Sequence, residues 1–385
     1  MQIDNIENKS KIAIVAVGYN RILSLKRLLG SLLKSNYPEG TDVPLVISID
    51  CSNDKVLYDY VENFEWPYGE KYVFIQKNRL GLKEHILKCG DLTKYFKAIV
   101  LFEDDIYAGR YFYDYVSQAV DYYYEDENIA QISLYNSQLC FYSLLPFCAL
   151  NNGYDAYASQ DVSTWGECWT DRMWAEFRKF MNQQNNFSLE KYEVPETMKK
   201  WTKAWSVYYI AYILDTKKFI LTPYVSHSTN FNDAGVHNDS SNTIFQVDLM
   251  NGYKRYEFGA FKDLVKYDIF YNNISIYCWI DKDHVDLSLD LYNFRPYDKK
   301  RFILTTAILP YKVIRSYGLQ LRPVELNIKE DIEGQGIYLY DTNESIKTKP
   351  KFDLSFIEYL LHGFNNKKIL KFIIYKFRKK YIKRP

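Results

Sequence analysis

Short apolar runs alternate with amphipathic stretches along the first part of the chain. Residues 11–17, 44–50 and 72–75 are apolar runs of strand length. Ser24 is the predicted N-cap of a helix between the first two runs. The leucines of this helix recur at helical spacing: Leu25, Leu28, Leu29, Leu32 and Leu33. A strand, a helix and a second strand in this order predict a parallel sheet.

A fourth apolar run, residues 98–102, is followed directly by Glu103, Asp104 and Asp105. The run fits a strand buried on both faces, so the acids are predicted at its carboxyl end, where open α/β sheets bind ligands. Adjacent carboxylates repel one another, and a fold keeps them together mainly where a cation or a polar ligand compensates. Oxygen ligands suit Mg²⁺ or Mn²⁺, which takes further ligands from water and phosphates. A solvated acidic turn is the alternative interpretation.

Tryptophans and histidines gather further along the chain. Residues 111–124 are predicted to form a helix and residues 130–134 a strand. Five of the seven tryptophans follow between residues 165 and 205. Trp165 and Trp169 flank a glycine in a predicted loop, where stacking on a ligand is more plausible than for a helix core. His227 lies in a polar loop after the predicted strand 219–225; a surface histidine is the alternative there.

The remainder of the chain predicts a smaller unit and a basic end. Residues 274–280 and 285–291 alternate at period two, as half-buried antiparallel strands do. The polar run 237–242 suits a linker. We therefore divide the chain into a sheet domain at 1–240, an α/β or β-rich accessory domain at 241–350, and a basic amphipathic helix at 351–385.

Composition excludes several function classes. The chain carries 49 basic and 48 acidic residues, so no global nucleic-acid footprint is present. Its six cysteines form no C-x-x-C pair, and its polar N-terminus is not a signal peptide, which together predict a cytoplasmic protein. No apolar run reaches membrane-spanning length. The glycine motifs of dinucleotide enzymes and P-loop enzymes are absent.

The C-terminal tail combines apolar residues at helical spacing with many basic residues. A helix of this kind lies in the plane of an anionic membrane surface and does not span the bilayer. The tail therefore predicts peripheral contact with an anionic membrane. The alternative is a terminal helix that packs its apolar stripe on the accessory domain.

Four ordered motifs together resemble the GT-A glycosyltransferases related to family 2. They are the strand end with Tyr19-Asn20-Arg21, the strand end at Asp50, the turn 78–82, and the run ending in Glu103-Asp104-Asp105. The acidic triplet is similar to the metal motif of N-acetylglucosaminyltransferase I and of a group of bacterial sugar transferases. Those bacterial enzymes also carry segments like Trp165-Gly166-Glu167-Cys168-Trp169 and like residues 223–237, which end in a histidine.

The resemblance covers about residues 10–240 and implies a Rossmann-like mixed sheet flanked by helices. It also implies transfer of a sugar from a nucleotide-sugar donor to a glycan or lipid-linked glycan in bacterial surface polysaccharide synthesis, inversion at the anomeric carbon, and Mn²⁺ or Mg²⁺ as cofactor. By this resemblance, Asp105 and His227 would hold the metal, and Trp165 and Trp169 the acceptor. The implied donor-binding residues are Tyr19, Asn20, Arg21, Asp50, Asn78, Gly81, Glu103 and Asp104.

One position departs from the family pattern. The family places an acid, which looks like the catalytic base, directly after the tryptophan that corresponds to Trp205, and this chain has Ser206 there. Serine cannot serve as that base near neutral pH. Glu167 is the predicted substitute, followed by Asp171 and Asp233. Ser206 supports one alternative, a catalytically silent sugar-binding or nucleotide-binding scaffold. A second and less favoured alternative is a sugar nucleotidyltransferase, because such enzymes use similar sheets and metals.

Overall fold

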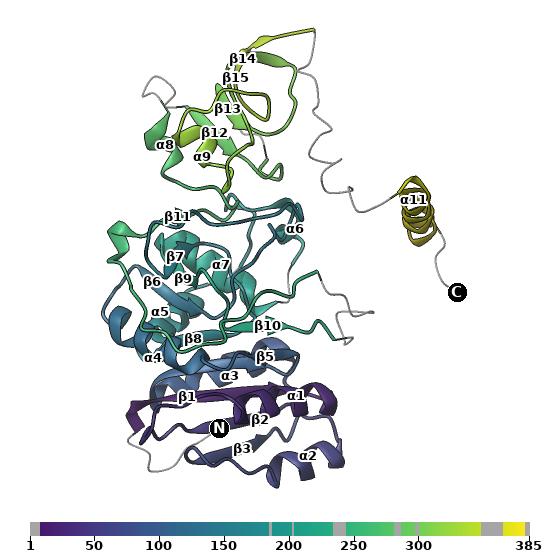
Figure 1. The fold of residues 1–385 in the computed structure, drawn as a ribbon. Coiled ribbons are helices and arrows are strands. Elements are labelled where there is room, and N and C mark those ends of the chain that lie inside the picture. The colour runs from purple at the N-terminus through teal and green to yellow at the C-terminus, as the bar shows by residue number, and fades with distance from the viewer. Residues whose placement is uncertain are drawn as a thin grey trace.

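A computed structural model describes residues 8–184, 187–201, 204–233, 244–280, 286–296, 300–347 and 365–381. Alternating strands and helices make up its first part (Figure 1). These are β1 (Asn8–Gly18), α1 (Ile22–Leu33), β2 (Leu45–Ile49), α2 (Lys55–Glu62), β3 (Lys71–Ile75), α3 (Leu82–Gly90), the 3₁₀ turn η1 (Asp91–Lys94) and β4 (Phe96–Glu103). The predicted parallel pairing is confirmed, because β2 and β4 both run parallel to β1.

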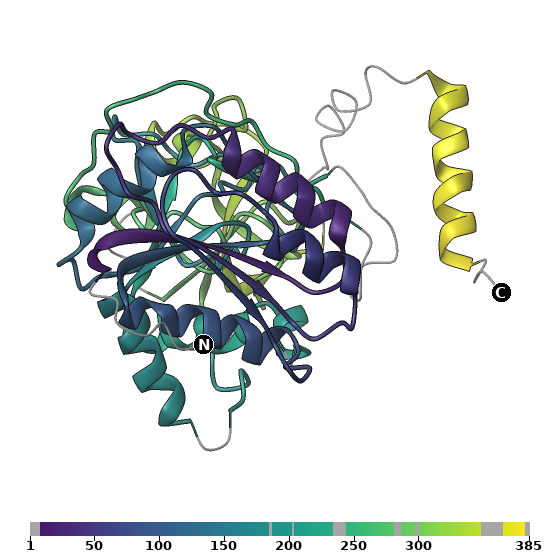
Figure 2. The same ribbon diagram turned by 90° about the horizontal axis from the view of Figure 1, so that it is seen from below.

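The middle part extends this sheet. Its elements are β5 (Ile106–Ala108), α4 (Phe112–Tyr123), β6 (Ile129–Ser133), β7 (Ala156–Ser159), β8 (Glu167–Thr170), α5 (Asp171–Asn182), α6 (Glu196–Lys199), α7 (Trp205–Thr216), β9 (Phe219–Pro223), β10 (Ser228–Asn230), η2 (Phe261–Asp263) and β11 (Lys266–Tyr267). Nine strands form one mixed sheet in the order β11-β7-β9-β6-β8-β4-β1-β2-β3. Helices α1 and α3 cover opposite faces of its parallel part (Figure 2). The mixed α/β class predicted from the sequence is confirmed.

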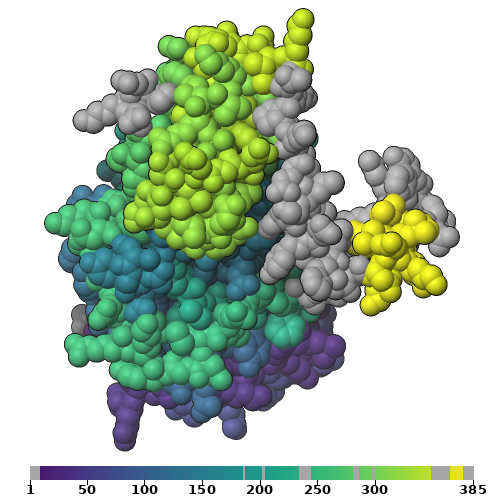
Figure 3. Space-filling model, turned by 45° about the horizontal axis from the view of Figure 1, so that its top comes forward, coloured from purple at the N-terminus to yellow at the C-terminus, as the bar shows by residue number. Residues whose placement is uncertain are grey.

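A second, smaller sheet follows. The elements are α8 (Ile276–Trp279), β12 (Leu287–Asp290), β13 (Phe302–Thr305), β14 (Tyr311–Tyr317), α9 (Leu326–Lys329) and β15 (Ile337–Ser345). Their sheet order is β12-β13-β15-β14. The last element, α11 (Asn366–Tyr381), stands apart from the described body of the protein, as the space-filling view also shows (Figure 3). Within the described ranges, no helix is both long and apolar enough to cross a bilayer.

Three local predictions were wrong. Ser24 does not cap α1, because the helix begins after Arg21 and buries Ser24 in its first turn. The segment around Gly166 is not all loop, since strand β8 begins at Glu167. Residues 274–280 contain the short helix α8 instead of a strand.

The predicted boundary at residue 240 also needs correction. Residues 237–242 lie outside the described residues, but β11 continues the nine-stranded sheet through parallel pairing with β7. Leu264, Ile269 and Phe270 belong to the core of that sheet. The sheet unit therefore extends beyond residue 240, and the smaller sheet begins with β12.

Candidate functional site

The carboxyl end of β4 brings three acids against a single arginine. Strand β4 ends at Glu103, and the turn after it carries Asp104 and Asp105. Arg21 follows the neighbouring strand β1 and reaches both aspartates: its Nε donates to Asp104 Oδ2 at 3.2 Å and its Nη1 to Asp105 Oδ2 at 3.3 Å. We call these four residues the acid edge. Their contact follows from the parallel pairing of β1 with β4, which places both carboxyl ends side by side.

The acid edge carries more negative charge than Arg21 neutralises. Burial and the neighbouring Asp105 and Asp104 raise the pKa of Glu103 to about 8. Burial also raises the pKa of Asp104 to about 6, although the hydrogen bond from Arg21 opposes this shift. The pKa of Asp105 is raised by burial as well. A cation placed at the edge would therefore stabilise the ionised carboxylates.

The donor set at this edge fits a hard divalent cation. The side chain of Asp105 is 18% exposed and that of Asp104 is 6% exposed, so Asp105 is the more accessible ligand. No three histidine, cysteine or acidic side chains group as a complete metal site within the part of the chain that the structure describes. Mg²⁺ is commonly held by one or two carboxylates together with substrate phosphates, which is the arrangement that Asp105 can offer.

His227 is not brought to Asp105. Strand β10 pairs antiparallel with β5, so Asn230 faces Ile106 and the backbone N–H of Phe231 donates to the Asp105 carbonyl at 2.9 Å. His227 lies at the other end of this pair, where its ring stacks on Tyr115 at 4.4 Å and is 1% exposed. Burial lowers the pKa of His227 to about 3. The expected metal role of His227 is therefore not supported; His237 lies outside the described residues.

The donor-binding residues predicted from the sequence lie along the same strand ends. Asp50, 3% exposed, follows β2 and accepts hydrogen bonds from the backbone N–H groups of Leu80 at 2.8 Å and Gly81 at 2.9 Å. Asp50 thus stabilises the turn that starts α3. The sequence analysis expected Asp50 to contact the nucleotide directly, and the structure instead engages both of its oxygens in this turn. Asn78 in this turn is exposed.

Tyr19 and Asn20 stand beside this turn, directly after β1. Tyr19 is half-buried and Asn20 exposed. The guanidinium of Arg79 stacks over the Tyr19 ring at 3.7 Å. An aromatic ring and exposed amides at the strand ends suit the base and ribose of a nucleotide.

Glu167 joins the acid edge from inside the sheet. It pairs with Leu101 of β4, so its side chain lies on the face that also carries Glu103. Glu167 is 0% exposed, and neither carboxylate oxygen has a hydrogen-bond partner among the described residues. Burial, and then the charge of Glu103, raises the pKa of Glu167 well above its usual range. This burial keeps Glu167 from direct contact with an acceptor.

Two further predicted site residues lie elsewhere. Asp171 starts α5 near the amino end of β4, opposite to the end that carries the acids, and there it accepts a hydrogen bond from Tyr124 at 2.8 Å and pairs with Lys9 at 3.3 Å. Trp169 is 0% exposed and donates to the Tyr209 hydroxyl at 3.0 Å. The structure therefore removes Asp171 as a base and Trp169 as an acceptor contact. Trp165 remains half-buried near the acid edge.

The sequence analysis missed the support that α1 gives to the site. Ser24 Oγ donates to Asp233 Oδ2 at 2.7 Å, and Arg27 pairs with the same carboxylate. The Arg21 guanidinium also donates to the Asp233 carbonyl at 3.4 Å. Arg21, Ser24 and Arg27 recur every three residues, a spacing that places them on one helix face and could have indicated a shared partner.

The buried charge of Glu167 leads to a stability prediction. A raised pKa in the folded protein means that protonated Glu167 favours folding below its unfolded pKa of about 4.3, and that this contribution is lost as pH rises. Glu167→Gln does not titrate at this position. We expect the variant to gain up to about 1.4 kcal/mol per pH unit over the wild type between pH 5 and the folded pKa, measured by urea unfolding. Exposed Glu65→Gln is the control, and a pH-independent difference for Glu167→Gln would contradict the prediction.

No family model matches the sequence, and no curated protein matches it. Solved structures similar to the chain include S. aureus TarS 1-349 in complex with UDP-GlcNAc, at 14% identity and a TM-score of 0.38, over 60% of this chain and 62% of that one. GalNAc-T7 with UDP, GalNAc and Mn²⁺ is similar at 14% identity and a TM-score of 0.40, over 58% of this chain and 44% of that one. The mannosyltransferase PcManGT from Pyrobaculum calidifontis with GDP-Man and Mn²⁺ is similar at 12% identity and a TM-score of 0.34, over 58% of this chain and 61% of that one. The chain thus spans less than two thirds of each of these neighbours.

Proposed function

We propose that this protein is a nucleotide-sugar-dependent glycosyltransferase with a GT-A type catalytic unit. One observation carries the proposal: three consecutive carboxylates end a central parallel strand beside Arg21 and the braced turn before α3. This edge combines a place for a cation with a place for a nucleotide. A strongly basic, glycine-rich loop after the first strand would favour a nucleotidyltransferase instead, and residues 18–21 contain one glycine and one arginine.

The roles follow from where each side chain lies. Tyr19, Asn20 and Asn78 would bind the nucleoside, and Asp50 would hold the turn that positions Asn78. Asp105 would hold Mn²⁺ or Mg²⁺, which when bound neutralises the donor diphosphate as it leaves. Glu103 and Asp104 would orient hydroxyls of the ribose or the sugar, and the hydrogen bond from Arg21 holds the Asp104 carboxylate in place.

Inversion of the anomeric configuration is the proposed stereochemistry. A single displacement needs one base and no enzyme nucleophile. Assay of donors carrying different sugars and nucleotides, with and without Mn²⁺, followed by NMR of the product anomer, tests both parts of the proposal. No turnover of any donor would contradict transfer, and a product with the donor's configuration would contradict inversion.

The base has to come from the carboxylates near the edge, since Ser206 stands at the start of α7. Glu103 and Asp233 are the candidates, because burial keeps Glu167, which also lies there, from direct contact with an acceptor. We expect the amide variant that removes the base to lower transfer about 100-fold or more and to affect nucleotide binding little. Steady-state transfer and calorimetric UDP binding measure the two effects. Asp171→Asn is the matched control, because Asp171 lies near the amino end of β4, away from the acid edge.

Ser206 also favours a second candidate, a catalytically silent sugar-binding or nucleotide-binding scaffold. A scaffold would bind nucleotide sugars and leave them intact. If the wild type binds UDP but turns over no donor, the scaffold replaces the enzyme. If the wild type is active and every amide variant retains that activity, the enzyme stands and the base is another group.

We also propose that the enzyme works at the cytoplasmic face of a membrane, on a glycan or lipid-linked glycan of a bacterial surface polysaccharide. The described side chains of α11 support this location, because Leu370 is 58% and Ile373 45% exposed on a helix rich in lysine. These apolar groups are not packed on the smaller sheet. An anionic bilayer surface offers both an apolar layer and counter-charges for such a helix.

A further inference from the structure

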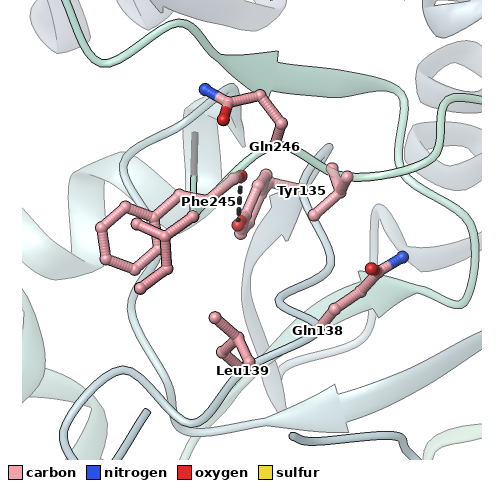
Figure 4. Close-up of a pocket in the computed structure, with 7 residues that line it drawn as sticks. Tyr135, Gln138, Leu139, Phe245 and Gln246 are labelled. Carbon is pink, nitrogen blue, oxygen red and sulfur yellow. Dashed lines mark hydrogen bonds between the residues drawn. The ribbon is translucent and has the colours of Figure 1, made fainter. Parts of the chain in front are cut away.

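A pocket with a mixed polar and apolar lining lies between two segments that are far apart in the sequence. It has a volume of about 180 Å³ and opens between residues 135–139 and 244–247 (Figure 4). The Tyr135 hydroxyl donates to the Phe245 carbonyl at 2.9 Å and ties the two segments together. The residues that line the pocket are uncharged: Tyr135, Gln138, Leu139, Ile244, Phe245, Gln246 and Val247.

Tyr135 and Phe245 are the aromatic residues of the lining, and further rings pack against them. The Trp165 ring packs edge to face against the Tyr135 ring, with the ring centroids 4.7 Å apart, and its centroid lies 5.2 Å from that of Phe245. Phe141, which is 37% exposed, stacks on Phe245 with the ring centroids 5.4 Å apart. The Trp201 ring centroid lies 6.4 Å from that of Phe141. The cluster therefore presents ring surface to solvent and does not close into a core.

Hydrogen bonds link one wall of the pocket to strand β10 and, through it, to the acid edge. The Gln246 side chain donates to the Asn230 carbonyl at 2.5 Å, which fixes the segment 244–247 against β10. Strand β10 pairs with β5, and the next residue, Phe231, donates its backbone N–H to the carbonyl of Asp105. Trp165 belongs to the same wall, because its carbonyl accepts a hydrogen bond from Ser228 of β10 at 2.5 Å. A molecule in the pocket thus lies one short strand away from the proposed donor site.

We propose that this pocket binds one sugar ring of the glycan acceptor. A pyranose has an apolar C–H face that suits the aromatic wall, and hydroxyl groups that suit the Gln138 amide at the exposed rim. The uncharged lining disfavours a phosphate or a nucleotide, whose charges would lose hydration there without a counter-charge. The volume is below the roughly 300 Å³ of typical ligand sites, which limits the occupant to about a single ring. This assignment rests on the proposed glycosyl transfer and adds the acceptor subsite to it.

Saturation-transfer NMR on the full chain tests the subsite with methyl glycosides of glucose, galactose, mannose and N-acetylglucosamine. We expect saturation transfer to at least one glycoside, and its loss in Phe245→Ala. Gln138→Ala, at an exposed position, is the second variant and guards against misfolding of the first. Tyr253→Ala removes an aromatic ring that is 68% exposed outside the cluster, and should leave the signal unchanged.

Transfer kinetics separate this proposal from the proposed function. With an active donor and acceptor pair, both pocket variants should raise the acceptor KM about 10-fold and leave the donor KM and donor hydrolysis unchanged. If transfer occurs but neither variant changes the acceptor KM or the NMR signal, the subsite is overturned and the enzyme stands. If no donor is turned over but glycoside binding depends on Phe245, the subsite stands and the transferase fails. Concentration-dependent self-association that the variants abolish, without glycoside binding, would overturn the subsite in favour of a contact between copies.

Discussion

Asp105→Ala is expected to lower sugar transfer about 100-fold or more and to weaken the binding of UDP or GDP in the presence of Mn²⁺. Asp105 is the more accessible of the two aspartates that Arg21 contacts, and it would hold the proposed cation, which would neutralise charge on the donor diphosphate. Without Mn²⁺, the variant and the wild type should bind the nucleotide similarly. Calorimetric titration with and without EDTA, together with a transfer assay, measures both effects.

The control for this experiment is Asp121→Asn, which removes a carboxylate that is 70% exposed and pairs with Lys97 on the protein surface. Its activity and metal response should match those of the wild type. If Asp105→Ala binds the nucleotide as well as the wild type in Mn²⁺, and no donor is turned over by either protein, the metal-dependent transferase is refuted.

Deletion of residues 365–385 is expected to abolish binding to anionic vesicles. The tail carries nine basic residues after the last acid, Glu358: Lys367, Lys368, Lys371, Lys376, Arg378, Lys379, Lys380, Lys383 and Arg384. Each contributes about 1 kcal/mol near an anionic surface, so even partial engagement holds the protein at the bilayer. Co-sedimentation with phosphatidylserine vesicles should be strong at low salt and weaker at high salt, because charges are screened over about 10 Å at 0.1 M.

Neutral phosphatidylcholine vesicles separate attraction by charge from insertion of the apolar side chains. Leu370→Ser with Ile373→Ser keeps every basic residue and removes two exposed apolar groups. This double variant should bind anionic vesicles more weakly than the full chain and more strongly than the truncated one. Equal sedimentation of the full and truncated chains would rule out the membrane role of α11.

Strands β1, β2 and β4 of the parallel half of the sheet were predictable because they are largely buried on both faces, whereas the edge strand β3 is half-buried. Residues 98–102 of β4 are all 0% exposed, so their continuous apolar pattern had no competing interpretation as an amphipathic helix of that length. The acidic triplet could be placed at the strand end for the same reason. Because β1 and β4 run parallel, Arg21, which follows β1, lies beside the acidic triplet, which ends β4.

Long-range contacts and local turns were less predictable. The contact between Arg27 and Asp233 joins residues 206 positions apart, and nothing in either local pattern specifies its partner. Trp169 was expected in a loop because Gly166 breaks the pattern, but Gly166 takes a left-handed conformation with φ of 100° and the strand resumes directly after it. Period-two alternation in residues 274–280 did not produce a strand, because the turn after Asn273 starts α8.

The position of β11 limits how this protein can be divided for experiments. A fragment that ends at residue 240 would lose β11 and leave β7 as an uncovered sheet edge, a known cause of aggregation. Tyr267 of β11 also donates its hydroxyl to Glu325, and Asn272 donates to the Leu289 carbonyl at 3.1 Å. These contacts tie the last strand of the large sheet to the smaller one. A recombinant fragment should therefore retain both sheets.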